Sequence, residues 1–277
     1  PPLVKQRELV DAMETARTAR RTKLAEADAL LAGLDQYLLD TLGLAPPPDT
    51  PRKSFAVNLG AVIGKRLDPP AYQPLISYAE SHEIALRDLQ ELAEIGAHTL
   101  DKSTSDDELV PYIGLPECDL TEVREVVMRP YHEVRARSIV RPGDILFARI
   151  EPSVFNKKYV LTEDLRGNAF AYTSTEFYVV TPNPDQIETE YLYAMFFCSF
   201  VFAQTRGKTT GSSGRRRLDP EMFRTLRIPV PDMATQSVIA AETRRRRERA
   251  RTLRAEAEQG WAEAKRWFEE QLLGPDA

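Results

Sequence analysis

The first and the last forty or so residues of the chain carry apolar side chains at steps of three and four. The series is Leu24, Ala27, Leu31, Leu34, Leu38 and Leu42 in the first segment, and Leu253, Ala257, Trp261, Ala264, Phe268 and Leu272 in the last. This spacing places the apolar residues on one face of an α-helix. We therefore predict long helices over about residues 5–42 and 235–273.

The two predicted helices repeat one pattern. Pro1-Pro2-Leu3-Val4-Lys5-Gln6 aligns with Pro231-Asp232-Met233-Ala234-Thr235-Gln236, and Leu42-Gly43 aligns with Leu273-Gly274. A glycine commonly follows the last turn of a helix, so both copies have a defined end. Two amphipathic helices of equal length can bury their apolar stripes against each other. We expect them to form an antiparallel, coiled-coil-like pair.

The residues between these helices show short apolar runs separated by turn-forming residues. Runs rich in β-branched and aromatic residues predict strands over residues 110–113, 144–149, 159–161 and 176–180, with a weaker candidate at 224–228. Helical stretches are expected over residues 74–82, 86–95 and 190–204. The fold class is therefore α+β: a globular domain flanked by the two long helices. The expected domains are a helix (1–44), a linker and lead-in (45–85), the globular domain (86–232) and a second helix (233–277).

The charge of the chain is unevenly distributed. The formal net charge is −5, which by itself disfavours a nucleic-acid-binding protein. Residues 85–122, however, contain 2 basic and 10 acidic residues, whereas residues 124–227 contain 16 basic and 12 acidic residues. A polyanion responds to the local potential more than to the total charge. The central part of the chain can therefore attract DNA although the whole chain is acidic.

The two cysteines, Cys118 and Cys198, lie 80 positions apart. This pair favours neither a disulfide framework nor a zinc module, and a reducing cytoplasm suits it. No apolar run approaches the ~20 residues of a membrane span, so no membrane contact is expected. A start at Pro1, without a methionine, is typical of a fragment.

The strongest candidate for DNA contact is the basic segment over residues 204–217. It combines glycines, hydroxyls and cations, which suit close approach to phosphates. The candidate DNA-binding residues in it are Arg206, Lys208, Ser212, Ser213, Arg215, Arg216 and Arg217. The alternative is a polar loop that precedes a strand and touches no DNA.

A second candidate is Asn156-Lys157-Lys158, interpreted as a turn between two strands that enters a DNA groove. The alternative is a solvated hairpin tip. Arg149 is a further candidate for phosphate contact, together with Arg135, Arg137 and Arg141, although Arg149 could instead pair with Glu151.

Patterns of known catalytic sites are weak or absent. Asp68-Pro69-Pro70-Ala71-Tyr72 is similar to the Asp-Pro-Pro-Tyr motif of adenine methyltransferases, but Ala71 interrupts it and no glycine-rich cofactor loop accompanies it. His82, His98 and His132 do not have the spacing of metal ligands or of a catalytic triad. We therefore predict no catalytic residue, no cofactor and no metal site.

An ordered series of motifs resembles the specificity subunits of type I restriction–modification systems. Five segments resemble motifs of their target-recognition domains: Val110-Pro111-Tyr112-Ile113, Arg141-Pro142-Gly143-Asp144-Ile145-Leu146, Ser174-Thr175-Glu176-Phe177-Tyr178-Val179, Thr210-Gly211-Ser212-Ser213-Gly214, and Arg227-Ile228-Pro229-Val230-Pro231 with Gln236. Residues 86–95 resemble the opening helix of such a domain. The series covers residues 86–274. Asp232 and Met233 depart from the family pattern.

The resemblance implies a function and a set of partners. Such subunits read one half of a bipartite DNA site with each recognition domain, and their long helices dock methyltransferase subunits. Catalysis then belongs to the methyltransferase and restriction subunits, and a half-length subunit could act as a homodimer. Two alternatives stay open: a recognition module fused to an adenine-N6 methyltransferase, and a coiled-coil scaffold that does not bind DNA and uses the acidic region over residues 85–122.

Overall fold

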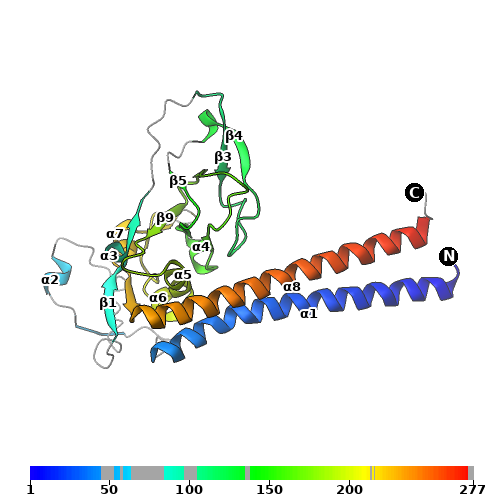
Figure 1. The fold of residues 1–277 in the computed structure, drawn as a ribbon, viewed down its shortest axis with the longest axis horizontal. Coiled ribbons are helices and arrows are strands. Elements are labelled where there is room, and N and C mark those ends of the chain that lie inside the picture. Colours follow the sequence, from blue (N-terminus) through cyan, green and yellow to red (C-terminus); the bar gives the residue numbers. More distant parts are fainter. Residues whose placement is uncertain are drawn as a thin grey trace. The chain divides into compact units, whose positions relative to one another are not determined.

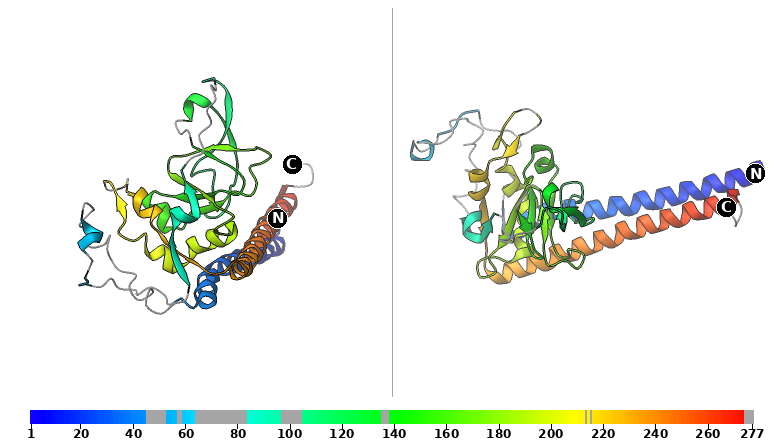
Figure 2. Two further views of the ribbon diagram at one scale, coloured as in Figure 1. Left: turned by 60° about the vertical axis from the view of Figure 1, so that its left-hand side comes forward. Right: turned by 90° about the horizontal axis from the view of Figure 1, so that it is seen from above.

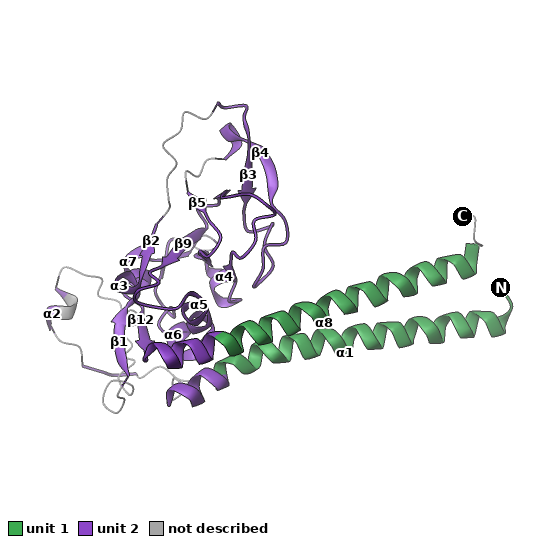
Figure 3. Cartoon of the chain, viewed as in Figure 1, with its two compact units in different colours: residues 1–35, 241–277 green, residues 36–240 purple. Residues whose placement is uncertain are grey.

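The computed structural model describes residues 1–44, 53–56, 59–63, 84–96, 105–134, 138–212, 214 and 216–273. The chain forms two compact units (Figure 3). Residues 1–35 and 241–277 make up the first unit, and residues 36–240 make up the second. Several predictions fall outside the described residues: the helix over 74–82, most of the linker, the Asp68–Tyr72 motif, His82, His98 and Gly274.

The first unit consists of most of α1 (Leu3–Leu42) and most of α8 (Met233–Leu273). The two helices lie side by side in every view (Figures 1 and 2). They are antiparallel, because Lys5 lies over the ring of Trp267 near one end, whereas Asp28 pairs with Arg254 further along. The predicted antiparallel pair of long helices is confirmed.

The seam between α1 and α8 is buried near its middle. Ala27, Ala250 and Leu253 form a buried cluster there, against which Leu30 and Leu31 pack. Ion pairs flank this seam, with N–O distances of 2.7 Å for Arg20–Glu258 and 2.8 Å for Lys23–Glu256. The apolar stripe is less covered towards the end of α8, where Leu272 is 44% exposed.

Glu242 on α8 has two arginine partners on its own helix. Its carboxylate accepts hydrogen bonds from Arg245 at 2.7 Å and from Arg246 at 2.6 Å. These hydrogen bonds, chiefly that from Arg245, lower the pKa of Glu242 from 4.5 to about 2. Because the folded-state pKa lies below its ordinary value, the ion pairs stabilise the fold above pH 4.5 and are lost as the pH falls towards 2.

We predict that Glu242→Gln lowers the free energy of unfolding at neutral pH by about 0.5–1 kcal/mol, as expected for partly exposed ion pairs. The difference from the unchanged chain should disappear as the pH falls from 4.5 to about 2. Urea unfolding at neutral and at acidic pH measures it. A difference that stays constant across this range would show that the carboxylate charge is not the cause.

The second unit is built around two four-stranded sheets. The first has the strand order β2-β9-β6-β7 and is antiparallel, and the second has the order β4-β3-β8-β5, with β3 and β8 parallel. Their strands are β2 (Ala93–Ile95), β3 (Leu109–Ile113), β4 (Val127–Pro130), β5 (Ile139–Val140), β6 (Ile145–Ala148), β7 (Tyr159–Leu161), β8 (Ala171–Thr173) and β9 (Phe177–Pro182). The strands predicted over 110–113, 144–149, 159–161 and 176–180 are therefore confirmed.

Short elements complete this unit. Two strand pairs lie outside the large sheets: β1 (Ala85–Asp88) with β12 (Arg227–Val230), and β10 (Thr209–Thr210) with β11 (Arg217–Leu218). The short helices are α2 (Leu59–Val62), α3 (Leu89–Leu92), α4 (Glu151–Phe155), α5 (Thr189–Phe197), α6 (Ser199–Ala203) and α7 (Pro220–Arg224), with a 3₁₀ turn at Tyr131–Glu133.

The sheet β2-β9-β6-β7 is buried on both faces, and its successive side chains point to opposite sides. Leu146, Val160 and Val179 belong to one apolar cluster with Ile113 and Val140 of the second sheet. The alternate residues form an aromatic cluster with the helices on the other face: Phe147 packs on Tyr159, on Phe196 of α5 and on Phe223 of α7. The core of the unit is thus two apolar layers, one on each side of this sheet.

Two helices predicted in this region differ from the helices in the structure. Residues 86–95 were expected to be one helix, but only Leu89–Leu92 is helical. The flanking residues pair with strands distant in the sequence, β1 with β12 and β2 with β9, and these hydrogen bonds replace helical ones. The helix expected over 190–204 is present as α5 and α6, which are interrupted at Cys198.

Gln236 ties the start of α8, which belongs to the second unit, to the rest of that unit. The side chain of Gln236 donates to the carbonyl oxygen of Pro231 at 3.0 Å and accepts from the backbone N–H of Glu188 at 3.0 Å. Asp232 caps the helix, since its carboxylate accepts from the backbone N–H of Thr235 at 3.0 Å, which lowers the pKa of Asp232. The departure from the family pattern at Asp232 therefore supplies a helix cap.

Candidate nucleic-acid interface

The basic segment over residues 204–217 forms a β-hairpin. Thr209 and Thr210 of β10 pair with Leu218 and Arg217 of β11. Gly211 and Gly214, with φ angles of 115° and 76°, shape the connection between the two strands. Ser212 lies exposed in this connection, and Ser213 and Arg215 lie outside the described residues. The segment is therefore a loop supported by two short strands.

Arg216 and Arg217 fasten this hairpin to the rest of the unit. The Nε of Arg216 lies 3.3 Å from the carboxylate of Glu151 on α4. Arg217 forms a forked pair with Glu176, because its Nε, at 2.9 Å, and its Nη2 both donate to the carboxylate. Such bidentate pairs fix the position of both partners. Both guanidinium groups therefore already have carboxylate partners within the domain.

Arg206 and Lys208 differ from these two arginines. Arg206 is exposed, Lys208 is half-buried, and Gly207 between them has a φ of 69°. Among the described residues, neither side chain has a carboxylate or a carbonyl partner. Burial lowers the pKa of Lys208, so an anion beside its ammonium group would be favourable. These are the two described cations of the segment that are best able to bind phosphate.

Asn156, Lys157 and Lys158 do not form the predicted turn between two strands. Asn156 ends α4, and the chain passes through Lys157, with a φ of 52°, into β7. The ammonium group of Lys157 donates to the carbonyl of Phe197 at 2.8 Å, and that of Lys158 donates to the carbonyl of Leu115 at 2.6 Å. The predicted local structure is wrong because Glu151–Phe155 is helical. A DNA contact by these residues stays a prediction.

Arg149 follows β6 and lies against an aromatic ring. Its guanidinium carbon is 5.0 Å from the centre of the Tyr178 ring. The suggested pair with Glu151 is wrong, because Glu151 pairs with Arg216. The backbone of Arg149 links the neighbouring segments: its N–H donates to Glu176 at 2.8 Å and its carbonyl accepts from Leu218 at 2.8 Å.

The structure brings Arg149, Arg216 and Arg217 together, since Ile150 and Arg217 form a β-bridge. Sequence reasoning assigned Glu151 to the wrong arginine and missed Glu176; these two carboxylates organise this group. No local spacing could have revealed them, because Glu176 and Arg217 are 41 positions apart. Arg135 and Arg137 lie outside the described residues. Arg141 is exposed, and its backbone N–H donates to Asp144.

The described part of the chain contains neither a cluster of metal-ligand side chains nor a helix suited to cross a membrane. No three His, Cys, Asp or Glu side chains gather there in a way that could hold a metal ion. No described helix has the length and apolar character needed to cross a membrane. His132 lies on the surface, with its Nδ1 2.9 Å from the carbonyl oxygen of Asp106.

A family model described as "Type I restriction modification DNA specificity domain" matches residues 82–242. The chain belongs to this specificity-domain family. The match spans more than half of the chain and includes both four-stranded sheets, the β10–β11 hairpin and the start of α8. The resemblance drawn from the sequence motifs is thereby confirmed.

Solved structures also resemble this specificity-domain chain. One, described as "Structural basis underlying complex assembly and conformational transition of the type I R-M system", matches with a TM-score of 0.54 and 15% identity over 98% of this chain and 59% of that chain. The HsdS subunit from Thermoanaerobacter tengcongensis matches with a TM-score of 0.49 and 16% identity over 100% of this chain and 60% of that chain. The chain thus spans about three fifths of the solved chains' length. No curated protein sequence matches it.

Proposed function

We propose that this chain recognises one half of a bipartite DNA site as part of a type I restriction–modification specificity subunit. The observation that carries this proposal is the family match over residues 82–242, which covers the β10–β11 hairpin and its basic residues. Strands β3, β6, β9 and β12 lie at the family motifs of this region, whereas residues 86–95 are not the single helix that the resemblance implies. Neither the fused methyltransferase nor the scaffold gains support from the comparisons.

Phosphate contacts in this proposal come from the basic hairpin. Arg206 and Lys208 bind the DNA backbone, and Ser212 donates a further hydrogen bond. Ser213 and Arg215, from the same stretch of sequence, stay candidates for DNA contact. Phosphate contacts position a protein on a duplex, whereas side chains in a groove read the base edges. Arg216 and Arg217 hold the hairpin in place through their ion pairs with Glu151 and Glu176.

The proposal makes this chain a non-catalytic subunit. Methyl transfer and cleavage belong to methyltransferase and restriction subunits, the methyltransferase docks on the paired helices α1 and α8, and the chain requires no cofactor of its own. We place the assembly in the cytoplasm.

A second recognition domain also belongs to the proposed assembly, either within a longer chain or from a homodimer partner. The start of α1 repeats the anchor seen at α8. Gln6 donates to the carbonyl of Pro1 at 2.8 Å, as Gln236 does to Pro231 at 3.0 Å. Gln236 is buried, and its side-chain oxygen also accepts from the backbone N–H of Glu188. Gln6 has no such contact among the described residues and is exposed. Exposed Leu3 and Val4 lie beside Gln6. These residues supply an equivalent surface for the second domain.

The test of the function is a salt titration of duplex binding by the purified chain. DNA recognition predicts that the logarithm of the affinity falls linearly with the logarithm of the salt concentration, with a slope of about −0.9 for each phosphate contacted. A scaffold without a DNA site predicts weak binding at all salt concentrations. Binding that is absent even at low salt would contradict the proposal.

A further inference from the structure

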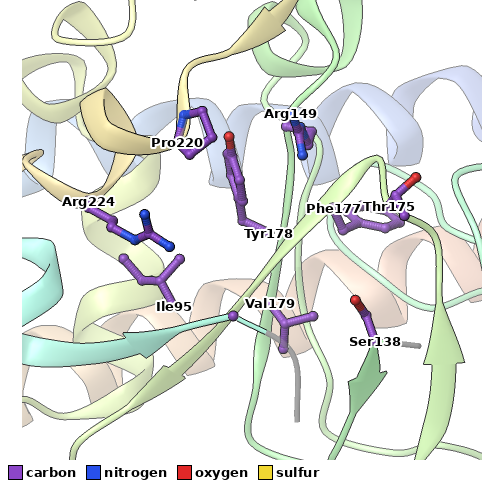
Figure 4. A pocket seen from close by; sticks show the side chains of 10 residues that line it. Ile95, Ser138, Arg149, Thr175, Phe177, Tyr178, Val179, Pro220 and Arg224 are labelled. Carbon is purple, nitrogen blue, oxygen red and sulfur yellow. The ribbon is translucent and has the colours of Figure 1, made fainter. Parts of the chain in front are cut away.

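The second unit contains a hollow of about 270 Å³ beside the aromatic cluster. Its lining comes from the ends of β2 and β9, from α7, and from the residues that follow β6 and precede β5 (Figure 4). The polar side chains on it are those of Arg149, Arg224, Tyr178, Thr175 and Ser138. No carboxylate belongs to this described lining, so the hollow carries two positive charges and several hydroxyl groups.

Arg149 is partly buried, and its guanidinium group has an unusual environment. No described residue supplies a carboxylate or a carbonyl to its guanidinium group, and its Nε is enclosed without an acceptor. An enclosed donor without an acceptor lowers the stability of a fold. The nearby Arg224 adds like charge, which its own exposed partner Glu221 only partly offsets. An anion in the hollow would relieve both costs.

The surroundings of Arg149 hold it in position for such an anion. Its guanidinium lies over the ring of Tyr178, whose hydroxyl donates to the carbonyl of Leu218 at 2.6 Å. Burial raises the pKa of Tyr178 to about 12, so the phenol stays neutral and adds no negative charge beside the two arginines. A cation fixed by stacking loses little side-chain freedom when it binds a ligand.

The geometry disfavours a stacked nucleobase as the occupant. A base would need a free aromatic face, and Tyr178 is the only aromatic ring of the described lining that a stacked base could use, since Phe177 is packed in the apolar core between the sheets. Phe223 stacks on one face of Tyr178, with centroids 4.5 Å apart, and Arg149 covers the other. A small oxyanion needs no such face, only donors, and arginines and hydroxyls supply these.

We propose that this hollow is a phosphate-binding site in which Arg149 is the principal ligand. Arg224 supplies a second positive charge, and the hydroxyls of Thr175 and Ser138 are the further donors. The phosphate comes either from the DNA backbone or from a free phosphate group. The first source rests on the proposed function, whereas the second does not.

Thermal unfolding in inorganic phosphate tests the site itself, with chloride at equal ionic strength as the reference. A ligand that binds only the folded chain raises the unfolding temperature with its concentration. We expect phosphate to stabilise the unchanged chain specifically, and Arg149→Met to weaken phosphate binding roughly 10- to 100-fold, as for the loss of charge-assisted hydrogen bonds. Arg7→Met, the same change at an exposed position of α1, should leave the phosphate effect intact.

Two results would overturn the site: no phosphate-specific stabilisation of the unchanged chain, or the same stabilisation in Arg149→Met. Arg149→Lys serves if the methionine variant does not fold, because it keeps one charge but loses the forked donors. It should still bind phosphate more weakly than the unchanged chain. Equal binding in Arg149→Lys would also overturn the proposal.

Duplex binding separates the two sources of phosphate. If the site takes a DNA phosphate, Arg149→Met lowers the salt slope of duplex binding by about 0.9. If it takes a free phosphate, the variant loses phosphate stabilisation while the salt slope stays unchanged, which supports the second source. Failure of the proposed function is a different result, since the unchanged chain would then bind no duplex at any salt concentration.

Discussion

Replacing Arg206 and Lys208 together with glutamine is expected to weaken duplex binding by one to two orders of magnitude near ~0.1 M salt, because each removes a charge-assisted phosphate contact. The salt slope should fall by about 1.8, since each phosphate contact contributes about 0.9. The loss should be similar for all duplex sequences, because phosphates carry no sequence information. Fluorescence anisotropy over a range of salt concentrations measures both quantities.

The matched control for this variant removes two charges elsewhere in the same unit. Arg124 and Arg166 are exposed, and their guanidinium groups donate to the carbonyls of Pro116 and Arg124. Arg124→Gln with Arg166→Gln changes the net charge equally and should leave the salt slope nearly unchanged. Equal losses in the two double variants would mean that only the total charge matters, and would remove Arg206 and Lys208 from the proposed contacts.

Leu253→Asp is expected to produce the largest loss of stability in the helix pair. Leu253 is 2% exposed and packs with Ala27 and Ala250 at the middle of the seam. A carboxylate at this position has no partner in the apolar cluster, and burying an unpaired charge costs about 3 kcal/mol or more. Thermal or urea unfolding followed by the helical circular dichroism signal should show a marked decrease in stability.

Ala255→Asp is the control for the seam, because Ala255 lies exposed two residues further along α8. It introduces the same side chain on the opposite side of the helix and should change stability by less than about 0.5 kcal/mol. If the two variants were equally stable, the α1–α8 seam would not contribute to folding as the described packing implies.

The sequence predicted the long helices well because their signal is local and repeated. Each stripe at steps of three and four extends over about five turns. Gly43 ends α1 as expected: its φ is 64°, and the N–H of Leu44 donates to the carbonyl of Leu39. The antiparallel pairing followed from the repeated helix starts. The alternating strands of the central sheets were also recognisable from their β-branched and aromatic residues.

Residues 86–95 show where local reasoning fails. Their composition favours a helix, and helix propensity differs among ordinary residues by less than about 1 kcal/mol. Two strand pairings outweigh this preference: β1 pairs with β12, and β2 pairs with β9. These partners lie 85 to 145 positions further along the chain, and no window of neighbouring residues contains them.

The candidate site shows the same limit. Its residue types were predictable, since glycines, hydroxyls and cations are concentrated in residues 204–217. The contact that each cation makes was not predictable, because its partner is distant in the sequence. Arg217 pairs with Glu176, Lys157 donates to Phe197, and Lys158 donates to Leu115. The structure separates cations that hold the domain together from Arg206 and Lys208, which the described residues leave available.

Selection of bound duplexes from a random pool tests the central claim most directly. The unchanged chain, at a salt concentration that suppresses non-specific binding, should enrich one short contiguous motif, because one recognition domain reads one half-site. The Arg206→Gln/Lys208→Gln variant should enrich the same motif with lower yield, since it loses phosphate contacts only. Retained duplexes with no common motif would contradict sequence recognition by this chain.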